Sequence, residues 1–204
     1  MDNFLLYVLI SAITIASPGP GVILTLSNTI RYNFMTAFSG ILGIAIGMVM
    51  VSLISVTSLG ILLATSATAF TIMKFIGAIY LIYLGIKLWR TSTLAFDLNK
   101  QGSEQSLLKH FVEGLTITLI NPKPIFFFMS LFPQFIDLSK NYTLQFMYLT
   151  LTFCGLIIII HTFYALFAHI ARQWLSSSKG RKNMNRASGS AFILFGLGLG
   201  YTHR

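Results

Sequence analysis

The chain has 204 residues, of which 55% are hydrophobic and only 9% are charged, and its formal net charge is +9. A soluble domain needs about a quarter of its residues charged, and a disordered chain needs low hydrophobicity, so the composition argues against both. It is typical of an integral membrane protein, whose cytoplasmic loops collect Lys and Arg, and the basic charge therefore gives no reason to expect a nucleic-acid partner. With Cys154 as the only cysteine, an intrachain disulfide and a cysteine-based zinc site are excluded.

Three long apolar stretches occupy the first half of the chain. They run from about Phe4 to Ile30, with an interruption at Ser17-Pro18-Gly19-Pro20, from about Ala37 to Ala64, and from about Phe70 to Trp89. About 20 apolar residues cross a bilayer as a helix, and backbone groups in hydrocarbon must bond within their own segment. Each stretch is therefore predicted to be a transmembrane helix. The first has no basic start and continues past Pro20, which favours a retained helix over a signal peptide.

A polar stretch from Arg90 to Lys109 divides the chain, and three further spans follow it. They cover about 110–136, interrupted at Asn121-Pro122-Lys123-Pro124, then about 144–171, and, after a basic loop over 172–186, about 187–201. The sequence thus predicts an all-α integral membrane protein with six transmembrane helices in a single membrane domain over residues 1–204. Ten of the 14 Lys and Arg residues fall at the loops after spans one, three and five. This bias predicts cytoplasmic odd loops and both termini outside.

The two halves resemble each other. Pro18 and Pro20 in the first span are matched by Pro122 and Pro124 in the fourth. Spans three and six share a pattern of a basic residue, glycine and two aromatics, over Lys74–Tyr83 and Arg186–Phe195 respectively. Three spans per half make the second half enter from the other side, so the pattern predicts an inverted repeat of about 1–89 and 110–204, joined by a cytoplasmic loop over 90–109. Chance similarity between apolar helices is the alternative.

The Pro-x-Pro pairs are the strongest functional signal in the sequence. Proline removes a backbone donor and clashes with the preceding turn, so Pro18-Gly19-Pro20 and Pro122-Lys123-Pro124 should break helices 1 and 4 near the middle of the membrane. Irregular backbone at that depth is tolerated only beside protein or a water-filled cavity. Broken helices of this kind bind substrate in many transporters, which predicts a substrate site or gate at the breaks. A purely structural kink is the alternative.

Lys123 lies between two of these prolines, too deep in its span to reach the interface easily. A charge at that depth is costly unless it is paired or hydrated. The residue is therefore a candidate counter-charge for a substrate carboxylate or part of a gate, and it could instead cap carbonyls freed by its own prolines. Asn121 could bind either a ligand or the broken backbone.

Two other residues are candidates for proton coupling. Glu113 is the only carboxylate inside a predicted span, where it could pair with Lys109 or carry a proton in the cytoplasmic path. His161 lies near the middle of span five and could relay a proton or join two helices by a hydrogen bond.

Small residues line one side of span two. Gly40, Gly43 and Gly47 place a smooth stripe there, which favours close packing within the protomer, with a homodimer contact as the lesser alternative. The sequence has no P-loop and no His/Asp metal cluster, so it predicts neither a metal site nor a cofactor and gives no support for ATP-driven transport.

The motifs Ser17-Pro18-Gly19-Pro20, Asn121-Pro122-Lys123 and Gly77-Ala78-x-Tyr80-Leu81-x-Tyr83-Leu84-Gly85 resemble the LysE/RhtB family of amino-acid exporters. The resemblance covers essentially the whole chain. It implies efflux of an amino acid such as lysine, threonine, homoserine or leucine across a bacterial inner membrane, driven by the proton gradient. Family importance carries over to Pro18, Gly19, Pro20, Asn121, Pro122 and Lys123. The single Cys154 does not fit the redox branch of the broader superfamily.

These features agree with a secondary transporter that is embedded in the lipid bilayer and exports small amino acids. Because Glu113 is the only acidic residue available in the spans, neutral amino acids are favoured weakly over dibasic ones. A channel or exporter for a metal cation or other small ion is the alternative, although a cation pore usually shows acidic or carbonyl rings. A membrane scaffold without transport would leave the paired prolines unexplained.

Overall fold

The computed structural model describes residues 4–65, 67–90, 106–136, 141–168, 170–171 and 177–201. The described elements are α1 (Phe4–Ala16), α2 (Pro20–Arg31), α3 (Phe34–Thr65), α4 (Ala67–Arg90), α5 (Leu107–Ile120), α6 (Pro122–Phe135), α7 (Tyr142–Leu166) and α9 (Ser178–Tyr201). All are helices, which confirms the predicted all-α class for the described part of the chain. Most of the polar stretch predicted over 90–109 lies outside the described residues.

Both predicted helix breaks are present. Residues 17–19 are not helical, and α1 and α2 meet there at a bend of 56°. α5 and α6 are separated by Asn121 alone. Pro20 begins α2 and Pro122 begins α6, the position where the missing N–H of proline costs no helical hydrogen bond. The local chemistry of the prolines therefore sets where each long helix divides.

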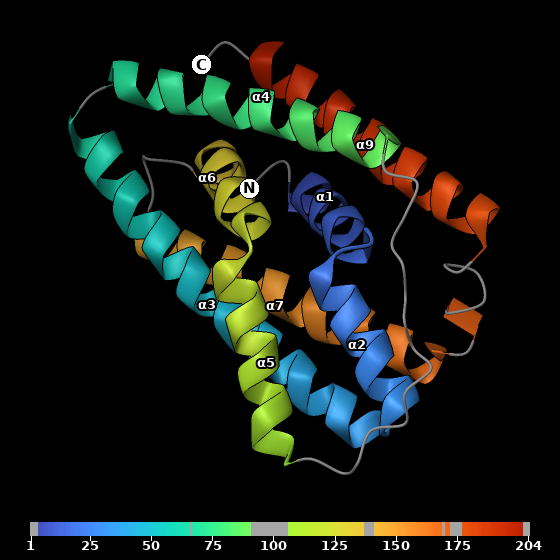
Figure 1. The fold of residues 1–204 in the computed structure, drawn as a ribbon. Coiled ribbons are helices and arrows are strands. Elements are labelled where there is room, and N and C mark those ends of the chain that lie inside the picture. The colour runs from blue at the N-terminus through green and yellow to red at the C-terminus, as the bar shows by residue number, and fades with distance from the viewer. Residues whose placement is uncertain are drawn as a thin grey trace.

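The helices are arranged so that the two halves interlock. α4 and α9 lie side by side across one side of the molecule, and the remaining helices pack beneath them (Figure 1). α3, from the first half, packs on α5 and α6 of the second, while α7, from the second half, packs on α1 and α2 of the first. α3 and α7 also contact each other, as do α4 and α9.

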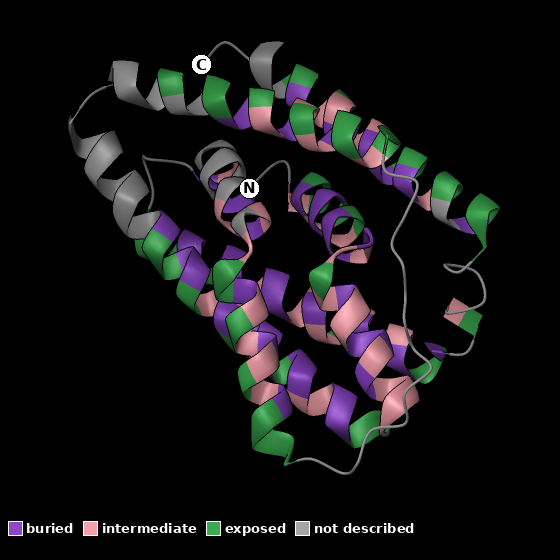
Figure 2. Cartoon of the chain, in the orientation of Figure 1, coloured by how far each residue is buried: buried purple, intermediate pink, exposed green. Residues whose placement is uncertain are grey.

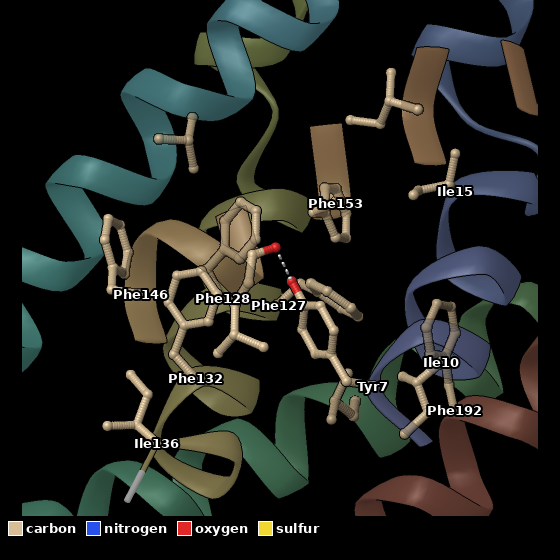
Figure 3. Close-up of a cluster of buried hydrophobic side chains, with 14 of the residues drawn as sticks. Tyr7, Ile10, Ile15, Phe127, Phe128, Phe132, Ile136, Phe146, Phe153 and Phe192 are labelled. Atoms are coloured by element: carbon tan, nitrogen blue, oxygen red, sulfur yellow. Dashed lines mark hydrogen bonds between the residues drawn. The ribbon is translucent and has the colours of Figure 1, made fainter. Parts of the chain in front are cut away.

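An aromatic core joins these elements. Phe128 and Phe132 of α6 stack at 4.7 Å between ring centroids, and Phe153 of α7 meets Phe128 edge-on at 4.9 Å. Tyr7 of α1 enters the same cluster, where its hydroxyl donates a hydrogen bond of 2.9 Å to the Leu149 carbonyl (Figure 3). Burial of these large rings stabilises the contact between the halves.

The glycine stripe of α3 packs against α5 within the chain, as the sequence favoured. A Cβ atom added at Gly43 would lie 2.0 Å from the Phe111 carbonyl oxygen, and one added at Gly114 would lie 2.1 Å from the Gly40 carbonyl oxygen. Two helices can approach this closely only where a glycine leaves room for the backbone of the facing helix. A second glycine crossing joins α4 and α9, where a Cβ at Gly85 would lie 2.6 Å from the Gly189 carbonyl oxygen.

Large apolar side chains cover much of the outer surface. Leu5 of α1 is 71% exposed, and Ile120 of α5 is 75% exposed. Exposed residues alternate with buried ones along the described helices (Figure 2). Apolar side chains exposed at this density suit contact with lipid rather than water.

Six spans were predicted, but fewer of the described helices are both long enough and apolar enough to cross a membrane. Among the described residues, α3 over Phe34–Ser55 and α7 over Tyr142–Leu166 could each cross a membrane, and the bent pair of α1 and α2 could make a third span. α5 and α6 are 14 residues each, too short to cross singly. α4 and α9 carry several Lys and Arg residues.

The prediction of a basic loop over 172–186 is wrong for its second part, because α9 already begins at Ser178. Contacts with α4 support this polar start of the helix. The Arg186 guanidinium lies 5.4 Å from the centre of the Trp89 ring, and Trp89 Nε1 donates to Ser190 Oγ at 3.3 Å. The basic residues suggested a loop, but contacts with the neighbouring helix α4 stabilise this segment as a helix.

Candidate functional site

A cavity of about 60 Å³ lies between the two helix breaks. All the broken helices contribute to it, together with α3 and α7. Its walls are mostly apolar. The polar side chains that line it are those of Thr14, Ser17, Thr118, Asn121, Lys123 and His161.

Most of the site residues predicted from the sequence meet at this cavity. Those that line it are Gly19, Pro20, Asn121, Lys123, Pro124 and His161. Pro18 is buried in the first break but does not line the cavity. The side chain of Pro122 lies outside the described residues, and Glu113 lies elsewhere.

Lys123 crosses from the second break to the first. Its Nζ atom donates to the Thr14 carbonyl at 3.1 Å and to Ser17 Oγ, and it lies 5.5 Å from the centre of the Phe192 ring. In a continuous helix the Thr14 carbonyl would accept from the N–H four residues later, at position 18, where proline has none. Lys123 therefore caps a carbonyl freed by Pro18 in the other half of the chain. The prediction that it caps carbonyls freed by its own prolines is wrong.

Tyr164 caps the carbonyl that is freed by the second proline of the first break. The sequence analysis did not identify Tyr164 as a site residue. Pro20 leaves the Ala16 carbonyl without its helical donor, and the Tyr164 hydroxyl on α7 donates to that carbonyl at 2.8 Å. The sequence does show that position 16 needs a donor. It does not show which of the distant side chains supplies one.

The two downstream half-helices begin differently. Asn121 caps α6, since its Oδ1 atom accepts the Lys123 backbone N–H at 3.0 Å, so the structure gives this side chain a backbone partner. α2 begins at Gly19, which has no side chain to cap the helix. Gly21 and Val22, whose N–H groups are the first of α2, both line the cavity, at the positive end of the helix dipole.

His161 connects α7 with α2 at the cavity wall. Its Nδ1 atom and Thr25 Oγ1 share a hydrogen bond of 2.8 Å, and both residues are buried. The predicted hydrogen bond between helices is thus present. Because the bond uses Nδ1, the Nε2 atom is left for a ligand, a water molecule or a proton.

Glu113 lies in a second and larger opening, of about 1060 Å³, between α2 and α5. It pairs with His110, whose Nδ1 lies 2.9 Å from Glu113 Oε2, and the predicted pairing with Lys109 is wrong. The His110 ring is nearly fully buried and packs 4.8 Å from the Tyr32 ring. Pro20, Ile117 and Asn121 line both this opening and the cavity, so the two are neighbours.

The alternative of a metal-cation exporter would be supported by a cluster of metal-binding side chains. In the described ranges, no three His, Cys, Asp or Glu side chains gather where they could hold a metal ion. Cys154 is buried, with Sγ 3.5 Å from the Ala45 carbonyl oxygen.

Comparison with known proteins decides the family. Residues 12–203 match the model of the LysE type translocator. The chain belongs to the LysE-type translocator family. The LysE-type translocators are multi-pass membrane proteins that export amino acids, and they are not enzymes.

Individual LysE-type relatives cover nearly the whole chain. The homoserine/homoserine lactone efflux protein of Salmonella typhi is 36% identical over 190 residues, which is 93% of this chain and 92% of that protein. The leucine efflux protein of Enterobacter sp. (strain 638) is 29% identical over 206 residues, covering 98% and 96%. A membrane protein of Vibrio cholerae without a named substrate is 33% identical over 196 residues, covering 95% and 94%. No solved structure matches the chain.

Proposed function

We propose that this translocator exports small neutral amino acids across the bacterial inner membrane in exchange for protons, and that the substrate binds in the cavity between the two breaks. The observation that carries the proposal is the composition of that cavity. Among the residues that the structure describes, Lys123 is the one lysine or arginine that lines it, and no carboxylate does. A dibasic substrate would need a partner for its second positive charge, whereas a neutral amino acid needs none. The named relatives, a homoserine and a leucine efflux protein, agree with this class.

The substrate carboxylate would bind at the positive side of the cavity. Lys123 Nζ and the uncapped N–H groups of Gly21 and Val22 both favour an anion there. The ammonium group of the substrate would bind where α5 ends, at the negative end of that helix's dipole. The Thr118 carbonyl is freed by Pro122 and accepts only a long bond of 3.3 Å from the Asn121 N–H, so it retains capacity for a second donor.

The cavity between the breaks adjoins the larger opening beside Glu113, because Pro20, Ile117 and Asn121 line both. We expect the substrate to reach the cavity through that opening, which is the proposed path on the cytoplasmic side.

Six transmembrane segments in two inverted halves belong to the same proposal. The α1–α2 and α5–α6 pairs would each make one broken span, and α3, α4, α7 and α9 the others. The exchanged packing, with α3 on α5 and α6 and α7 on α1 and α2, supports two halves related by a twofold axis. Both termini would lie outside the cytoplasm.

The test is counterflow in proteoliposomes containing the purified protein, with labelled homoserine, threonine, leucine and lysine offered with and without a pH gradient. We expect saturable counterflow of at least one neutral amino acid, accumulation that collapses when a protonophore is added, and little flux of lysine. Unsaturable flux would indicate a channel. Flux of lysine alone would contradict the proposed substrate class.

A further inference from the structure

The two carbonyls freed in the first break are not held equally. The Thr14 carbonyl has two donors, Lys123 Nζ at 3.1 Å and Ser17 Oγ at 2.7 Å. The Ala16 carbonyl accepts from the Tyr164 hydroxyl at 2.8 Å, and the structure gives it no other donor among the described residues. If Lys123 turned toward a ligand, Ser17 would still satisfy Thr14. If Tyr164 moved away, Ala16 would lose its partner.

From this asymmetry we propose that Tyr164 is a positioning residue that holds the α1–α2 break in shape while Lys123 leaves it for the substrate carboxylate. The proposal rests on the substrate site proposed above. In the resting protein Lys123 bonds to the break. When a carboxylate enters, the ammonium changes partner from Thr14 and Ser17 to the substrate, and the break then depends on Tyr164.

The position of Ala16 explains how this contact would reach the substrate. Its chain neighbours Ile15 and Ser17 both line the cavity, so a shift of the Ala16 carbonyl moves the cavity wall and an acceptor of Lys123. Tyr164 is held in turn on α7, where its ring lies edge-on to His161 at 6.4 Å between centroids. α7 thus fixes two points of the site, His161 at the wall and Ala16 at the break.

The first measurement is transport. Tyr164→Phe removes only the hydroxyl oxygen and retains the ring. With the amino acid that the wild-type protein carries in counterflow, we expect KM to rise about tenfold while Vmax per folded protein changes less than about twofold, because the site is displaced but the transport cycle remains. A merely structural role would lower the yield or the Tm and leave KM unchanged.

Two other tyrosines provide matched controls. Tyr7→Phe removes a buried hydroxyl that donates to the Leu149 carbonyl, and Tyr7 does not itself line the cavity, so the variant should lower Tm without changing KM. Tyr148→Phe changes an exposed tyrosine on the same helix as Tyr164 and should change neither. An unchanged KM in Tyr164→Phe, or an equal KM rise in Tyr7→Phe, would overturn the positioning role.

A second measurement needs no substrate and separates this proposal from the function. Lys123→Met removes the ammonium from the break, as substrate binding would, so the break should then depend more on Tyr164. Tyr164→Phe should lower the Tm in detergent by about 3–6 °C with Lys123 present, and by clearly more in the Lys123→Met background. Equal shifts in both backgrounds would overturn the positioning role. If the two Tm shifts differ as expected but the protein transports no amino acid, the proposed function is wrong and the role of Tyr164 at the break stands.

Discussion

Lys123 and Thr14 lie 109 positions apart, and the ammonium of one donates to the backbone carbonyl of the other at 3.1 Å. Each residue belongs to a different helix break. The bond therefore ties the two breaks together across the cavity. Because the carbonyl is neutral, a substrate carboxylate would be a stronger partner for the ammonium, since its negative charge adds a Coulombic attraction that the carbonyl lacks.

Removal of the charge at position 123 is expected to weaken substrate binding and leave the fold intact. Lys123→Met retains most of the side-chain volume, and Ser17 still donates to the Thr14 carbonyl. Loss of a charge-assisted bond of about 1.5–3 kcal/mol should raise KM in counterflow by roughly 10- to 100-fold. Lys182→Met, at an exposed site on α9, is the control and should transport normally. Normal KM in Lys123→Met would remove this residue from the site.

The two candidates for proton coupling can be separated by one pair of variants. His161 lines the same cavity as Lys123, whereas Glu113 lies in the neighbouring opening. We expect His161→Asn to retain counterflow but to lose accumulation driven by a pH gradient, because the proton site would be gone. Glu113→Gln should retain both. Gradient-driven accumulation in His161→Asn together with its loss in Glu113→Gln would reverse the assignment.

The glycine crossing of α3 and α5 predicts a large effect from one methyl group. In Gly43→Ala the new Cβ would lie 2.0 Å from the Phe111 carbonyl oxygen, so the helices must separate. A loss of about 1–3 kcal/mol or more is expected, seen as a lower Tm in detergent. Gly155→Ala on α7 is the matched control, since nothing lies within 4 Å of its added Cβ. That variant should be neutral, or more stable by up to about 1 kcal/mol.

The proposed orientation can be tested with single cysteines, because Cys154 is the only one to remove. In a Cys154→Ala background, Thr143→Cys and Ser178→Cys place thiols at exposed positions near the starts of α7 and α9. An impermeant maleimide should label position 143 in intact cells and position 178 only after permeabilisation. The reverse pattern would place both termini inside.

Much of this molecule follows from local rules that act within a few residues. Composition determined that the chain is helical and apolar enough for a membrane. The prolines determined where α1 and α5 end, since a missing N–H affects only the turn before it. The same rule shows that the carbonyls of Thr14 and Ala16 lose their donors. Residues of these two breaks, together with His161, could also be named as site candidates before their proximity was known.

Tertiary packing alone decided which partners these groups have. Lys123 donates to a carbonyl freed by Pro18 rather than by its own prolines, Tyr164 reaches Ala16, and Glu113 pairs with His110 instead of Lys109. Several distant side chains could serve each unsatisfied group, and only the crossing of the helices brings one within hydrogen-bonding distance. The early start of α9 has the same cause, because α4 supports a basic segment that would otherwise suit a loop. Sequence determines which groups need a partner, and the fold selects the partner.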